Sequence, residues 1–142
     1  MTDPHNLQRF IDAQESVYGT ALLEILAGSK QSHWMWFIFP QLRGLGRSPT
    51  AQYYGIASLD EAQAYLQHPV LGPRLRECVE AILSWEDRSA EQILGPVDAL
   101  KLCSSLTLFD LANPHSVFAE GLAAFHGGEG DRHTLALLNG ER

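Results

Sequence analysis

Two segments of the chain combine side chains that could hold and process a small charged molecule. The first runs from Lys30 to Gln41 (KQSHWMWFIFPQ) and holds two of the three tryptophans between polar ends. Aromatic walls with a few convergent polar groups are typical of small-molecule pockets. A hydrophobic core is built from the same aromatic residues, so both interpretations stay open. The ligand-binding candidates in this segment are Lys30, Ser32, Trp34, Trp36 and Gln41.

The second segment runs from Asp98 to Thr107 and contains Lys101, which with Lys30 makes up all the lysine of the chain. A compact amine suits a point contact to phosphate or a proton transfer. On a helix, spacings of three and four residues place Asp98, Lys101 and Ser105 on one face. A surface ion pair beside a solvated serine would explain the same residues.

We hypothesise that the fold brings both segments together around one partly enclosed polar site. An amine in an apolar segment needs an acceptor, and Asp98 is the only carboxylate of its segment before Asp110. The catalytic candidates are His33 as general acid or base, because an unperturbed imidazole titrates near pH ~6.5, with Asp98 and Lys101 beside it. Whether the protein is an enzyme stays open.

A glycine-containing loop, Gly44-Leu45-Gly46-Arg47-Ser48, follows the first segment and precedes an expected helix at Pro49. Backbone N–H groups at a helix start bind phosphate or carboxylate, and Arg43 would add positive charge. Arg43, Gly44 and Gly46 are therefore further ligand-binding candidates. An ordinary turn is the alternative interpretation.

The charge pattern favours a small anionic partner over nucleic acid or a membrane. The chain has a net charge of −7, which disfavours binding to nucleic acid and to anionic lipid. Residues 25–76 nevertheless carry five basic and two acidic residues, a net +3. This local field would attract a phosphate- or nucleotide-like ligand, although a buried aromatic segment also excludes acids. A structural or protein-interaction domain without catalytic activity is the alternative function.

The sequence lacks the standard signatures of metal, cofactor and nucleoside triphosphate binding, and we predict neither a cofactor nor a metal. One cluster, His126, Glu129, Asp131 and His133, contains metal-binding residue types. A glycine-rich loop followed by a capping Asp131 explains it more simply.

Helix punctuation covers most of the chain and predicts an all-α fold, a single domain over residues 1–142 built as a compact array of about eight short helices. Asn6, Ser16, Ser48, Ser58 and Ser89 are expected helix caps, with capping boxes at the last two. The apolar stripe from Leu71 to Leu83 has helical spacing. Only His33–Phe39, apolar on both faces, could be either strand or helix.

The cellular setting predicted from the sequence is the cytoplasm. The longest apolar run, Trp34–Pro40, is too short to span a membrane, and residues 1–10 lack the order of a signal peptide. Cys78 and Cys103 are expected to be reduced. Nothing in the pattern predicts an oligomeric state.

The Lys30–Gln41 segment resembles the signature of a bacterial family of unknown function, number 1810, whose members are sometimes mislabelled calpastatin. The resemblance covers nearly the whole chain and continues through the segments 44–46, 68–72, 98–109 and 131–135. It implies an all-helical single domain and no reaction. The calpastatin label does not fit, because an inhibitor of that kind is polar and disordered whereas this chain is 45% hydrophobic.

Overall fold

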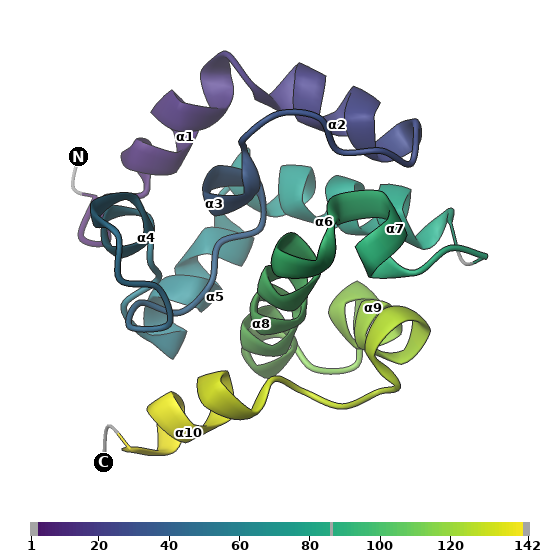
Figure 1. Ribbon diagram of the computed structural model, residues 1–142. Coiled ribbons are helices and arrows are strands. Elements are labelled where there is room, and N and C mark those ends of the chain that lie inside the picture. Colours follow the sequence, from purple (N-terminus) through teal and green to yellow (C-terminus); the bar gives the residue numbers. More distant parts are fainter. Residues whose placement is uncertain (1–2, 86, 141–142) are drawn as a thin grey trace.

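The computed structural model describes residues 3–85 and 87–140, which form ten α-helices (Figure 1). The described ranges contain no β-strand, and within them Leu42 and Ile56 form an isolated parallel bridge. The predicted all-α array of about eight short helices is confirmed, and the ambiguous segment contains the four-residue helix α3. The helices are α1 (Gln8–Glu15), α2 (Tyr18–Leu26), α3 (Met35–Ile38), α4 (Pro49–Tyr53), α5 (Leu59–Gln67), α6 (Leu71–Leu83), α7 (Ala90–Leu94), α8 (Pro96–Ala112), α9 (Val117–His126) and α10 (Arg132–Gly140).

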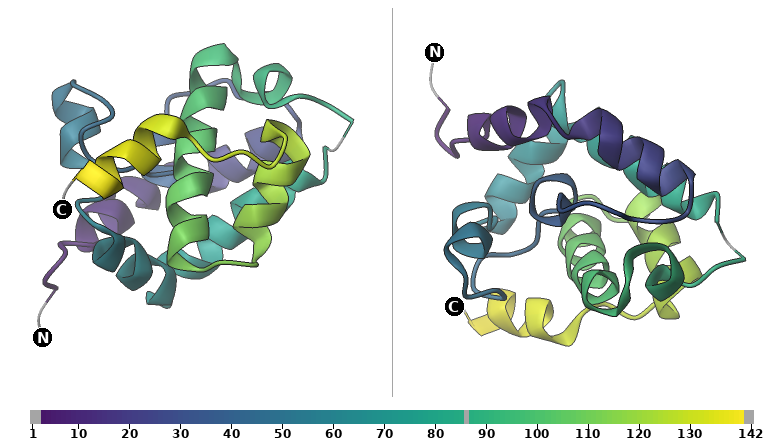
Figure 2. Two further views of the ribbon diagram at one scale, coloured as in Figure 1. Left: turned by 90° about the horizontal axis from the view of Figure 1, so that it is seen from below. Right: turned by 45° about the horizontal axis from the view of Figure 1, so that its top comes forward.

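Helix α8 is the centre of the fold and contacts α5, α7, α9 and α10 (Figures 1 and 2). It begins after Gly95, whose φ of 92° favours glycine, with Pro96 at its first position. Leu106, Leu108 and Phe109 are buried on different sides of the helix. A helix that is apolar on most sides must be enclosed by other elements, which explains its central place. No helix in the described ranges is long and apolar enough to cross a membrane.

Serine residues begin three helices where the sequence predicts them. Ser48, Ser58 and Ser89 each accept a hydrogen bond from the backbone N–H three residues further on, at 3.1–3.2 Å. Ser89 completes the predicted capping box with Gln92. The box predicted at Ser58 is only half formed, because the Glu61 side chain bonds elsewhere.

The start of α1 differs from the prediction. Asn6 has a φ of 51°, whereas a capping residue needs an extended backbone. The Asp3 carboxylate caps the helix instead and accepts from the N–H groups of Leu7 and Gln8, both at 2.9 Å. Ser16 ends α1 rather than opening α2, which has no side-chain cap.

A buried ion pair between Arg9 and Glu61 joins α1 to α5. The two atoms Nη2 and Oε2 are 2.6 Å apart, and the side chains are only 3% and 4% exposed. The second Glu61 oxygen accepts from the N–H of Ala57. The guanidinium also donates to four backbone carbonyls, those of His5, Asn6, Tyr53 and Gly55.

We predict that Arg9→Met destabilises the protein by about 3–5 kcal/mol, because it leaves the Glu61 carboxylate buried without a partner. The double variant Arg9→Met/Glu61→Gln should recover part of this loss. Urea unfolding followed by tryptophan fluorescence measures both, with the exposed Arg47→Met as the control. A cost for Arg9→Met no larger than that for Arg47→Met would contradict the interpretation.

Candidate functional site

Glu24 on α2 fixes the loop that leads into the aromatic segment. Its Oε1 accepts from the backbone N–H groups of Gln31 and Ser32 and from the indole N–H of Trp34, at 2.8–3.0 Å. Its Oε2 accepts from the Ser32 hydroxyl at 2.7 Å. Burial alone would raise the pKa of the Glu24 carboxyl, but these hydrogen bonds outweigh it and lower the pKa to about 2. Ser32 is therefore a positioning residue for this loop.

The loop delivers Lys30 to the start of α8, where three charged side chains meet. The backbone N–H of Lys30 bonds the Ile93 carbonyl at 2.8 Å, and its Nζ lies 2.9 Å from Asp98 Oδ2. Lys101 Nζ lies 3.3 Å from the other oxygen, Asp98 Oδ1. Of the predicted site residues, the structure thus brings Lys30, Asp98 and Lys101 together. One carboxylate serves two ammonium groups, so the cluster keeps one uncompensated positive charge.

The two tryptophans of the segment have different environments. The Trp34 side chain is buried in the core, with Lys30 Nζ 5.1 Å from its ring centroid. Trp36, on α3, is only partly buried, and Lys101 Nζ lies 4.1 Å from its ring centroid. Both are cation–π distances. Trp34 is therefore part of the core rather than a ligand contact, and Trp36 is the ring that can contact a ligand.

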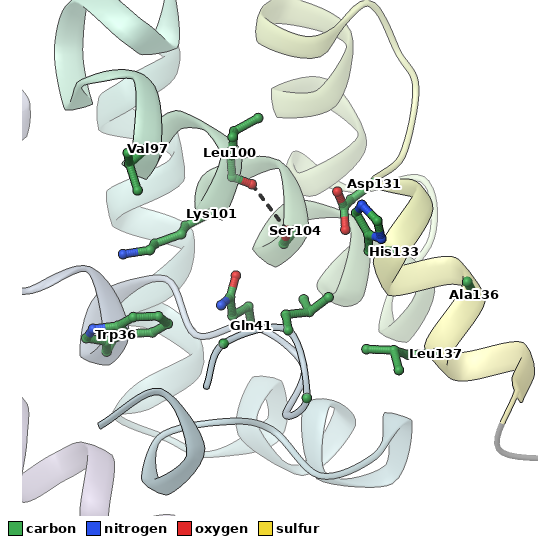
Figure 3. Close-up of a pocket in the computed structure, with 13 residues that line it drawn as sticks. Trp36, Gln41, Val97, Leu100, Lys101, Ser104, Asp131, His133, Ala136 and Leu137 are labelled. Carbon is green, nitrogen blue, oxygen red and sulfur yellow. Dashed lines mark hydrogen bonds between the residues drawn. The ribbon is translucent and has the colours of Figure 1, made fainter. Parts of the chain in front are cut away.

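A pocket of about 720 Å³ opens beside Lys101 and Trp36 (Figure 3). Trp36 and Lys101 lie at one end, and the side chains of α10 lie at the other, with Gln41 between them. This volume is in the range of small-molecule sites, whose walls are mostly apolar. The lining residues are Trp36, Gln41, Gly44, Leu45, Gly46, Val97, Leu100, Lys101, Ser104, Asp131, His133, Ala136 and Leu137.

Gln41 is the unusual polar residue of this pocket. It is 6% exposed, and its carboxamide points from the loop toward α8 (Figure 3). No described residue hydrogen-bonds this carboxamide, and its O and N atoms reach the solvent of the pocket instead of being fully buried. Water satisfies the amide in the free protein, and a ligand can replace these water contacts with hydrogen bonds of its own. The donor and the acceptor of the amide are therefore available to a ligand.

The glycine loop forms a wall of the pocket. Gly44 has a φ of 106°, which favours glycine. A Cβ on Gly46 would lie 2.6 Å from the Ala51 Cβ and 3.3 Å from the Trp36 ring, so only glycine lets the loop pack this closely. The helix that follows, α4, has five residues, and the Ser48 side chain accepts from the N–H of Ala51.

Besides Lys30, Ser32, Trp34 and Asp98, three further predicted site residues lie outside the pocket lining. His33 is exposed and is absent from the pocket lining, so it is not placed to act as its acid or base. The Arg43 guanidinium donates to the carbonyls of Gln52 and Gly55, both at 3.0 Å, and lines a separate depression. Ser105 is buried in the core with its hydroxyl unpaired among the described residues.

Ser104, rather than Ser105, is the serine of the pocket. Residues Val97, Leu100, Lys101 and Ser104 have the spacing i, i+3, i+4 and i+7, which defines one helix face. The sequence analysis assigned the site to the face of α8 that carries Asp98, Lys101 and Ser105. The face that lines the pocket is rotated about the helix axis from that one. The apolar Val97 and Leu100, 65% and 70% exposed, are the signal that marks the outward face.

The opposite wall comes from α10, which the sequence did not assign to the site. Asp131 caps this helix as predicted, since its Oδ2 accepts from the N–H and hydroxyl of Thr134 at 2.9 and 2.7 Å. The Asp131 N–H donates to the Thr107 hydroxyl on α8 at 2.7 Å. These bonds place His133 and Leu137 in the pocket wall. Among the described residues, no three His, Cys, Asp or Glu side chains cluster as metal ligands.

The fold and the pocket define a small all-α protein built around one central helix, α8. The chain belongs to the family described as "protein of unknown function (DUF1810)", whose model matches residues 4–138, so the family resemblance is confirmed. It is similar to the conserved hypothetical protein Rv1873 from Mycobacterium tuberculosis, with 56% identity and a TM-score of 0.94 over 96% of this chain and 99% of that one. No curated protein is significantly similar to the chain.

We predict that the Glu24 contribution to stability depends on pH. The pKa is near 4.5 in the unfolded chain and about 2 in the folded protein, so the stabilisation is complete above 4.5 and is lost as the pH falls toward 2. Glu24→Gln should cost about 1–2 kcal/mol at pH 7 and almost nothing near pH 2. Urea unfolding at several pH values measures this, with the exposed Glu80→Gln as the control. An equal cost at both ends of the pH range would rule the assignment out.

Proposed function

We propose that the pocket binds a small ligand with an anionic, phosphate-like group, and that Lys101 and Gln41 hold this group. The observation that carries the proposal is the Gln41 carboxamide, which belongs to a residue only 6% exposed, faces the pocket and makes no hydrogen bond to a described residue. Its donor and its acceptor can bond a ligand in place of water.

The charge beside the pocket supports an anion. Lys30 and Lys101 together carry two positive charges against one on Asp98, and their side chains are only 9% and 24% exposed. Limited contact with water strengthens the attraction between an ammonium group and an anion. The overall charge of −7 supports a small anion rather than nucleic acid as the partner.

We propose that the pocket binds a ligand, and we propose no reaction there. Of the three side chains predicted for catalysis, His33 lies outside the pocket lining, and Asp98 is paired with both lysines. Lys101 remains as a ligand contact. We also place the protein in a reducing compartment, the cytoplasm, because Cys78 and Cys103 are both free thiols.

A second candidate function is docking of a partner protein on the rim of the pocket. Val97 and Leu100 are 65% and 70% exposed and stand next to each other on one face of α8. Exposed apolar side chains beside a pocket are a feature of protein-interaction surfaces. A partner would bury both residues, whereas a small ligand would leave them on the rim.

Inorganic phosphate should raise the melting temperature, because a ligand that binds only the folded state stabilises it. Lys101→Met keeps the length of the side chain and should weaken phosphate binding at least about tenfold, since it removes a charge-assisted contact. Gln41→Leu should weaken it as well. The matched control is Arg43→Gln, which removes a positive charge outside the pocket and should leave the phosphate-induced shift unchanged.

Two results of this thermal-shift series would contradict the proposal. The first is no shift with phosphate, or with other phosphate-containing ligands, in the unmodified protein. The second is an equal loss of the shift in Arg43→Gln and Lys101→Met, which would place the anion elsewhere. Docking of a partner on the rim predicts instead that Val97→Ser and Leu100→Ser abolish an interaction that phosphate does not affect.

A further inference from the structure

We infer that the ligand of this pocket is a planar nitrogen heterocycle carrying a phosphate, such as a nucleoside monophosphate, and that Lys101 leaves the Trp36 ring to admit it. This inference rests on the proposed function and adds the class of ligand to it. Three features carry the inference: the two lysines sharing one carboxylate, the Trp36 face beneath Lys101, and the carboxamide of Gln41 beside it.

Lys101 can leave Asp98 without stranding a buried charge. Lys30 contacts Asp98 at 2.9 Å against 3.3 Å for Lys101, and it is the less exposed of the two, 9% against 24%. A carboxylate is costly to leave unpaired when partly buried, and here Lys30 keeps the pairing. Lys101 is therefore the lysine that can exchange its carboxylate for the anion of a ligand.

Movement of Lys101 would uncover an aromatic face. Its Nζ lies 4.1 Å from the centroid of the Trp36 ring, which is the distance of a cation–π contact. The ring packs closely against the backbone of Gly46, where a Cβ would collide with Ala51 and press on Trp36. This packing holds the ring in place. A fixed, partly exposed indole is a stacking platform, and stacking on it is open to any planar base.

The neighbouring Gln41 offers what the edge of a heterocycle requires. A carboxamide presents a donor and an acceptor side by side, the pattern with which asparagine and glutamine recognise a base edge. The Gln41 carboxamide points into the same pocket as Trp36 (Figure 3), and no described residue hydrogen-bonds its donor or its acceptor. An inorganic anion would use Lys101 but would leave the ring and much of the 720 Å³ volume empty.

Calorimetric titration with adenosine monophosphate, ribose 5-phosphate and inorganic phosphate tests the inference. Adenosine monophosphate should bind at least about tenfold more tightly than ribose 5-phosphate, because only it can stack. Trp36→Leu should abolish this preference and keep the binding of ribose 5-phosphate, and Trp36→Phe should retain most of the preference. Circular dichroism confirms that both variants fold.

Trp85 supplies a matched control, because its ring also lies under a cation, with Arg88 Cζ 4.4 Å from the centroid, and it is outside the pocket lining. Trp85→Leu should leave the preference unchanged. Equal affinities for adenosine monophosphate and ribose 5-phosphate would overturn the inference and leave the proposed function standing. Failure of all three ligands to bind would overturn both, and a preference that survives Trp36→Leu would overturn the stacking.

Discussion

The sharing of one carboxylate by two lysines is the interaction on which the candidate site depends. Asp98 lies in the first turn of α8, where a negative charge is favoured by the helix dipole, and it contacts Lys30 and Lys101 with different oxygens. It thereby attaches the loop after α2 to the central helix. The second lysine leaves the cluster with a positive charge at the end of a pocket.

Two further constraints set the position of that cluster. Glu24 accepts hydrogen bonds from the backbone N–H groups, the serine hydroxyl and the indole N–H of the loop. These bonds fix the loop backbone and so position Lys30 and Trp34. On the other side, the Thr107 hydroxyl bonds the N–H of Asp131 and holds the start of α10 against α8. These polar contacts fix the walls of the pocket, and none of them involves the carboxamide of Gln41.

The sequence predicts helices well where local chemistry decides them. Ser89 begins α7 because its side chain satisfies a nearby N–H, and the stripe from Leu71 to Leu83 has one buried face, so neither depends on distant residues. Asn6 fails as a cap because Asp3 competes for the same N–H groups and the backbone at Asn6 turns left-handed. The pairing of Lys30 with Asp98 was predictable, since a buried amine has few acceptors to choose from.

The composition of the pocket was less predictable because it depends on helix rotation and on long-range contacts. Ser104 and Ser105 are neighbours on α8, yet Ser104 lines the pocket whereas Ser105 is in the core. Arg43 was predicted as a ligand contact, but its guanidinium donates to the backbone carbonyls of Gln52, in α4, and of Gly55, just after it. His133 joins the site only because α10 folds back across α8 (Figure 2), which no local pattern reveals.

Nuclear magnetic resonance of the side-chain amides tests the central claim most directly. During titration with adenosine monophosphate, the carboxamide of Gln41 and the indole N–H of Trp36 should shift together and saturably. The carboxamide of Gln14 should not move, because it already bonds Phe37, Tyr65 and Arg74 inside the core. Resonances of Gln41 and Trp36 that stay unchanged, or shifts that centre on Arg43, would contradict the account.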